Sequence, residues 1–219
     1  MYRDHDVTPG KDATYQTIET PQGTLKRTLV LDGQPITGEE RDAETRRIDK
    51  AANDKAGLEK QRKAGAHDDA QAEEMLRMMP TAFLWTLRSA TPELITLDFK
   101  PNPAFSAPDM QSRVMAAMQG EMVIARNGNR IRTLRGALAS DVKIGFGLLG
   151  RLNQGGTFRV ERREVAPGRW QMTETHVHIG GHALLFKTIG QQQDEVKTEW
   201  KPSPAQNLQE AADLLRDAK

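Results

Sequence analysis

Three residues in the last quarter of the chain have types and a spacing that could bind a metal ion. Glu174, His176 and His178 alternate along a run that is typical of a β-strand, so their side chains share one face. His182 follows shortly after. Histidines in an H-x-H pattern can bind zinc with a carboxylate, as in a metal-dependent hydrolase. Val177 and Ile179 occupy the opposite, buried parity, however, which favours a solvent-facing sheet surface for the histidines, and we predict neither a metal nor another cofactor.

A second pattern, Gly145 to Gly150, spells G-x-G-x-x-G. In a dinucleotide-binding fold such glycines let the backbone approach a pyrophosphate at a helix N-terminus. Here Gly155-Gly156 arrives before a crossover helix could fit, and a β-like run from Thr157 follows. A glycine-rich strand connection is therefore favoured over nucleotide binding.

Charge is concentrated in one predicted hairpin, which carries Arg126, Arg130, Arg132 and Arg135. These arginines could meet lipid phosphates or an anionic partner, although a solvated edge that discourages strand aggregation is favoured. The whole chain has 31 basic and 30 acidic residues, which argues against a nucleic-acid partner. It has no cysteine, so thiol catalysis and disulfides are excluded within it, and no G-x-S-x-G or H-E-x-x-H motif suggests an enzyme.

The elements that would position these residues begin with strands over residues 2–31. A capping box at Thr37 and Glu40 predicts a helix to about Lys63. After a break at residues 64–66, Asp68 is predicted to cap a second helix, which Pro80 ends. Ser203 and Pro204 predict a C-terminal helix over about 204–217. Two apolar stripes are expected to be buried, one in the second helix and one in the C-terminal helix: Ala72, Met75, Leu76 and Met79; Leu208, Ala211, Ala212 and Leu215.

Residues 83–200 read as consecutive hairpins, with turns predicted at Asn127-Gly128, Pro167-Gly168 and Gly180-Gly181. One parity carries the apolar residues Leu97, Phe99, Met122, Ile124, Phe158, Val160, Val177, Ile179, Leu184 and Phe186. The opposite parity carries Thr96, Asp98, Glu121, Arg159, Glu161, His176 and His178. This alternation predicts an antiparallel sheet with one buried and one wetted face. The predicted fold is α+β in one domain, 1–219, with a helical region at about 37–80 and the sheet mainly in 2–31 and 83–200.

The stretch from Leu97 to Lys187 resembles the LolA-like superfamily of outer-membrane lipoprotein carriers. The resemblance lies in segments such as Leu97 to Pro103, Met118 to Ile124 and Asn129 to Ile131, and it covers about half of the chain. It implies a strongly curved antiparallel half-barrel whose concave face is covered by helices, in a periplasmic protein that holds acyl chains. The chain departs from the family in its long charged helical region and in having no helix before the first strand. An export signal is expected upstream or already removed.

The leading hypothesis is a non-enzymatic periplasmic binding protein. Its half-barrel would hold an acyl chain, a lipid or a lipidated protein against the ten apolar residues. One alternative is a metal-dependent hydrolase that uses Glu174, His176 and His178. Another is a lipoprotein-sensing scaffold that docks to a membrane-associated protein through the charged helix. No run approaches the roughly 20 apolar residues of a membrane span, so the chain is not expected to cross a bilayer.

Overall fold

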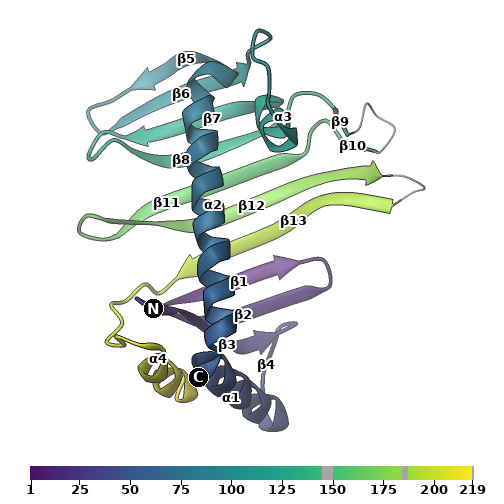
Figure 1. Ribbon diagram of the computed structural model, residues 1–219. Coiled ribbons are helices and arrows are strands. Elements are labelled where there is room, and N and C mark those ends of the chain that lie inside the picture. The colour runs from purple at the N-terminus through teal and green to yellow at the C-terminus, as the bar shows by residue number, and fades with distance from the viewer. Residues whose placement is uncertain (145–149, 184–186, 219) are drawn as a thin grey trace. The chain divides into compact units, whose positions relative to one another are not determined.

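The computed structural model of the chain describes residues 1–219 except 145–149, 184–186 and 219 (Figure 1). The described chain is α+β, with a large antiparallel sheet and four helices. It forms two compact units, a first unit of residues 1–70 and 195–219 and a second unit of residues 71–194. The predicted α+β class and antiparallel sheet are confirmed. Whether the two units unfold as one domain stays a prediction.

The sheet of the first unit is a meander of consecutive antiparallel strands. Its members are β1 (Tyr2–Thr8), β2 (Lys11–Thr20), β3 (Gly23–Leu31) and β4 (Gln34–Pro35), paired in that order. At the turn between β3 and β4, Asp32 and Gly33 both have positive φ, of 50° and 76°. Two successive left-handed residues suit the tight turns whose twist matches that of a hairpin. The Asp32-Gly33 break in the sequence therefore closes this hairpin.

Two helices follow this sheet, and the boundary between them differs from the prediction. The capping box of Thr37 and Glu40 begins α1 (Gly38–Asn53) as expected. The break then falls at Asp54, whose side chain accepts a hydrogen bond from the Gly57 amide (2.9 Å). From there α2 (Lys55–Ala82) runs unbroken through Gly65 (Figure 1). The predicted break at residues 64–66 was wrong, because one glycine costs a helix only about 1 kcal/mol among good helix formers.

The end of α2 also differs from the prediction. Pro80 lies inside the helix, two residues before its end, so it disturbs only the last turn. Met79 is buried and Met75 half-buried, but Leu76 is 50% exposed and Ala72 is exposed. The predicted buried stripe is therefore wrong at Ala72 and Leu76, since the buried contacts of α2 with the core of the second unit come from Met79 and Ala82.

The core of the first unit lies between its sheet and the helices α1 and α4 (Leu208–Arg216). The cap of α4 is Asn207, which accepts from the Glu210 amide (3.0 Å), rather than the predicted Ser203. An asparagine at this position bonds the third helical amide directly, which explains the later start. The predicted apolar stripe of α4 is confirmed, since all four of its residues are buried beside Ile18, Leu25 and Ile48: Leu208, Ala211, Ala212 and Leu215.

Helix side chains cover the part of the β3 edge that does not pair with β4. The backbone of Thr24 is bonded in both directions by the amide of Gln61, at 3.2 and 3.4 Å. Farther along, Arg47 donates to the Lys26 carbonyl (2.5 Å) and Glu44 accepts from the Thr28 amide (3.0 Å). Covered edges cannot pair with another chain. The charged helical region thus has a structural role at this edge.

The second unit holds a longer antiparallel sheet in the order β12-β11-β8-β7-β6-β5. These strands are β5 (Phe83–Ala90), β6 (Leu94–Pro101), β7 (Met118–Ala125), β8 (Arg130–Leu138), β11 (Thr157–Ala166) and β12 (Arg169–Ala183). Short strands β9 (Val142–Ile144) and β10 (Gly150–Leu152) pair with each other, and β10 also pairs with β12. Strand β13 (Lys187–Thr198) begins in the second unit and ends in the first, and α3 (Met110–Ala116) precedes β7. No helix in the described chain is long and apolar enough to cross a membrane.

The hairpin turns of the second unit match the sequence at two of three places. Gly128 and Gly168 have φ of 75° and 73° in the turns after β7 and β11. At the third, β12 continues straight through Gly180 and Gly181, so the predicted turn was wrong. A Cβ on Gly181 would lie 2.1 Å from the Arg151 carbonyl oxygen. This glycine therefore permits a close approach of β10 instead of a reversal.

Candidate functional site

The cross-strand register of the second unit defines an apolar face of its sheet. Directly paired residues of antiparallel strands project to the same face. Leu97, Met122, Leu134 and Val160 form one such row. Phe158 and Val177 form a pair in the next row, and Ile179 shares their face. The register thus places the described members of the predicted apolar set together, while Leu184 and Phe186 lie outside the described residues.

Burial along this apolar face is uneven. Phe99, Met122 and Ile179 are buried, at 4%, 6% and 8% exposure, within two core clusters closed by α3 and by the end of α2. Five others remain half-buried: Leu97, Ile124, Phe158, Val160 and Val177. Leu87 on β5 is paired with Leu97 and is 61% exposed. The helices therefore cover only part of the apolar face.

A pair of glycines brings two strands of this sheet unusually close. Gly120 and Gly136 are paired directly between β7 and β8. A Cβ on Gly120 would lie 2.0 Å from the Arg135 carbonyl oxygen, and one on Gly136 would lie 2.3 Å from that of Gln119. No side chain fits at such distances, so only glycine permits this packing. On the apolar face the ring of Phe158 lies over Gly136, where an added Cβ would be 3.0 Å from it.

The opposite face carries a charged row. Asp98, Glu121, Arg135, Arg159 and His176 are directly paired in succession across β6, β7, β8, β11 and β12. We call these five residues, together with the directly paired Glu161 and Glu174 on the same face of β11 and β12, the charged row. They belong to the polar parity predicted from the sequence, but this face is not uniformly wetted, because Glu121 and Glu161 are buried.

Ion pairs connect the first half of the charged row. Arg88 on β5 donates to Asp98 (3.0 Å) and Glu121 (2.5 Å), and Arg135 reaches Glu121 at 2.9 Å. Hydrogen bonding to Asp98 raises the pKa of Arg88. The alternation of the sequence does not assign Arg88 to the charged face, because a register shift between Leu87 and Ser89 interrupts the pattern there.

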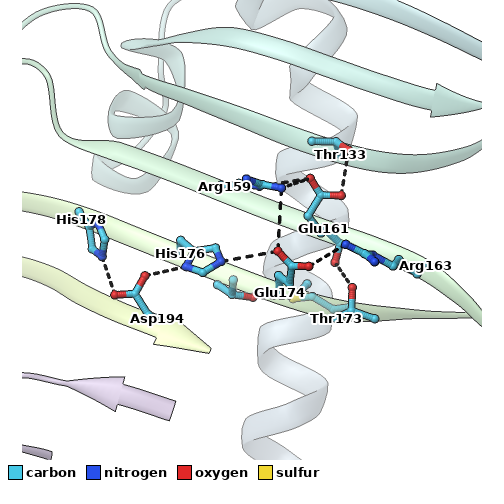
Figure 2. Close-up of polar contacts among 11 residues, drawn as sticks. Thr133, Arg159, Glu161, Arg163, Thr173, Glu174, His176, His178 and Asp194 are labelled. Carbon is cyan, nitrogen blue, oxygen red and sulfur yellow. Dashed lines mark hydrogen bonds and ion pairs between the residues drawn. The ribbon is translucent and has the colours of Figure 1, made fainter. Parts of the chain in front are cut away.

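The second half of the network, drawn in Figure 2, centres on two glutamates that are largely shielded from solvent. Glu161 accepts hydrogen bonds from Thr133 (3.1 Å) and from Arg159 (3.0 Å). Glu174 pairs with Arg163 (2.8 Å) and lies 3.9 Å from Arg159. Glu174 is thus held by a cation on the neighbouring strand β11, whereas Glu161 is held by Arg159 on its own strand and by the Thr133 hydroxyl on β8.

The two histidines of the H-x-H pattern share one carboxylate. Nδ1 of His176 lies 2.6 Å from one oxygen of Asp194 on β13, and Nε2 of His178 lies 2.8 Å from the other (Figure 2). Hydrogen bonds from His176 and then His178 lower the pKa of Asp194. Asp194 was missed from sequence because it follows three glutamines, with no apolar alternation to assign its face.

This arrangement of the histidines does not favour metal binding. The remaining ring nitrogen of His176 lies 3.8 Å from Glu174, a carboxylate already paired with Arg163, and His182 is exposed. Among the residues that the structure describes, no three or more of His, Cys, Asp and Glu are grouped to hold a metal ion. Of the G-x-G-x-x-G pattern, only Gly150 is described, as the first residue of β10.

Of the four hairpin arginines, Arg126 and Arg130 are exposed, and the other two lie among residues that are distant in sequence. Arg135 belongs to the charged row, whereas Arg132 lines a hollow of about 340 Å³. Arg162, Arg163 and Trp170, from the hairpin of β11 and β12, line the same hollow. Glu93 and Glu164 also line this hollow, so it has three arginines and two carboxylates.

Comparisons of the chain with protein-family models, with curated proteins and with solved structures find no match. The LolA-like resemblance of the sequence stays a prediction.

Proposed function

We propose that this protein is a non-enzymatic binding protein that holds an acyl chain, of a lipid or of a lipidated protein, on the apolar face of its second unit. The supporting observation is the incomplete cover of that face. Leu87 is 61% exposed, and Leu97 and Val160 are half-buried and belong to neither core cluster. Exposed contiguous apolar surface usually marks a binding site.

The energetics of such binding are adequate. Burial of an acyl chain contributes about 0.8 kcal/mol per methylene, so about ten enclosed carbons contribute roughly 8 kcal/mol, and each further methylene helps to offset the costs of association. The hollow lined by Arg132 and Arg162, and also by Glu93 and Glu164, offers arginines that a lipid phosphate could contact. The second unit thus offers an apolar surface for the acyl chain of an amphiphile and arginines for its phosphate.

The proposal assigns the charged row to structure rather than catalysis. Glu121, Glu161, Glu174 and Asp194 each accept hydrogen bonds or ion pairs from arginine or histidine. A general acid or base must be free to exchange protons with a substrate, whereas these carboxylates already accept hydrogen bonds from protein side chains. We further propose a curved, half-barrel sheet and a periplasmic location, as the LolA-like resemblance of the stretch from Leu97 to Lys187 implies.

Extraction of the purified protein with organic solvent, followed by mass spectrometry, tests the proposal. The expected result is a co-purified lipid or fatty acid at a stoichiometric level. The same extraction of folded Val160→Arg should yield little, because the arginine places a charge on the apolar face. Folded wild-type protein that yields no lipid, and that also fails to bind an added fatty acid, would contradict it.

A further inference from the structure

Three arginines from three elements line a small pocket in the first unit. Arg3 lies on β1, Arg27 on β3 and Arg41 on α1, and the pocket has a volume of about 190 Å³. Arg3 and Arg27 are both paired directly with Gln16 of β2, so their side chains project from one face of the sheet. Like charges in such a row repel one another, so the arrangement calls for a nearby negative charge.

Arg27 is the most enclosed of the three. It is 1% exposed and has the largest volume of the fully buried side chains among the described residues. A guanidinium carries five N–H donors. Within the described residues it makes a single hydrogen bond, from Nη1 to the Thr45 hydroxyl (3.3 Å). A buried charge with so few partners is among the costliest features of a fold.

No ion pair among the described residues compensates this positive charge. Arg3 pairs with Glu199 at 3.3 Å, and Glu44 is bonded by Arg47 at 2.8 Å. Neither Arg27 nor Arg41 forms an ion pair with any residue that the structure describes. Burial and then the charge of Arg41 lower the pKa of Arg27, against the opposing effects of Glu44 and Asp217.

We propose that this pocket binds a small oxyanion, such as a phosphate group, between Arg27 and Arg41. The planar guanidinium suits phosphate and carboxylate oxygens because it can donate two parallel hydrogen bonds. The pocket is smaller than the roughly 300–1,000 Å³ of sites for larger ligands, so it fits a free ion or a single charged group. This site lies in the first unit and does not depend on the proposed lipid binding.

The test measures the melting temperature of the full chain as inorganic phosphate is added, with sodium chloride holding ionic strength constant. Parallel titrations with glycerol 3-phosphate and acetate show which oxyanion is preferred. The expected result is a saturable rise for wild type and an affinity about tenfold weaker in Arg41→Gln, which loses charge-assisted hydrogen bonds. The control Arg46→Gln removes an exposed arginine from the same helix and should match wild type.

A second variant gives a signature that general ionic effects would not produce. In phosphate-free buffer, Arg27→Met should melt at or above the wild-type temperature, because it removes an uncompensated buried charge. At saturating phosphate the order should reverse, since only wild type gains from the ion. Two results would overturn the proposal: none of the three oxyanions raises the melting temperature of wild type, or Arg41→Gln responds as Arg46→Gln does. Either result is decisive even if Arg27→Met fails to fold.

Discussion

At the scale of single residues, ion pairs and hydrogen bonds link the titratable groups of the charged row into a structural network. The side chain of Glu161 is 9% exposed and that of Glu121 is 12% exposed, whereas their arginine partners are about half exposed. The carboxylates are thus more shielded from water than their cations. A shielded carboxylate needs its partners more than an exposed arginine does, so the energetic effect of a deletion should depend on which partner is removed.

Replacement of Glu161 by alanine tests this asymmetry. It leaves the Thr133 hydroxyl and the Arg159 guanidinium without their acceptor, so we expect the free energy of unfolding to fall by about 1–3 kcal/mol. Urea denaturation measures the change. Glu74→Ala, at an exposed site on α2, is the control and should stay within about 0.5 kcal/mol of wild type. Equal effects of the two variants would refute a structural role for the row.

Asp194 gives a prediction about pH. Its pKa in the folded state lies below the ordinary value of 3.8, so the ionised form is favoured by folding. Its contribution to stability is present above the ordinary pKa and is lost as the pH falls through the lowered one. Wild type should therefore melt above Asp194→Asn at about pH 6, and the gap should close in strong acid. Melting curves across this range measure it, and a gap that widens on acidification would contradict the assignment.

At the scale of elements, glycine has two different effects in this chain. Gly120 of β7 permits close strand packing, whereas Gly65 only weakens the helix α2. Gly120→Ala forces a methyl group against the Arg135 carbonyl and should destabilise the protein by about 1–3 kcal/mol or more. Gly65→Ala, in the exposed interior of α2 with no atom near its added Cβ, should instead stabilise it by about 1 kcal/mol. Thermal denaturation of the two variants compares them. Similar effects of the same sign would show that close strand packing at Gly120 is not required.

The sequence predicts the strands better than the helix boundaries, for a physical reason. Alternation in β6, β7, β11 and β12 separates polar from apolar side chains, so the charged row could be assigned to one face before its contacts were known. Helix limits depend on single local bonds, such as Asp54 to the Gly57 amide, which compete with other plausible caps such as Asp68. Arg88, Asp194 and the arginine pocket of the first unit were not found, since each depends on a register or a tertiary contact that no local pattern encodes.

At the scale of the whole molecule, the chain has two compact units, each with its own core. Helix α2 and strand β13 each begin in one unit and end in the other, so unfolding of either unit removes part of both elements. We therefore expect one cooperative unfolding transition, in keeping with the single-domain prediction. Trp200 stacks on Tyr2 in the first unit, and Trp85 packs on Phe99 in the second. Fluorescence of single-tryptophan variants should give coincident urea midpoints, and separated midpoints would show two independent domains.

The central claim is that the apolar face of the second unit binds an acyl chain. Titration of a fluorescent fatty acid into wild type, Val160→Arg and Thr157→Arg tests it most directly. Val160 is half-buried on the apolar face, whereas Thr157 is exposed on the face of the charged row. The account predicts saturable binding to wild type and Thr157→Arg, and its loss in Val160→Arg. Equal binding by all three folded proteins, or saturable binding by none, would contradict it.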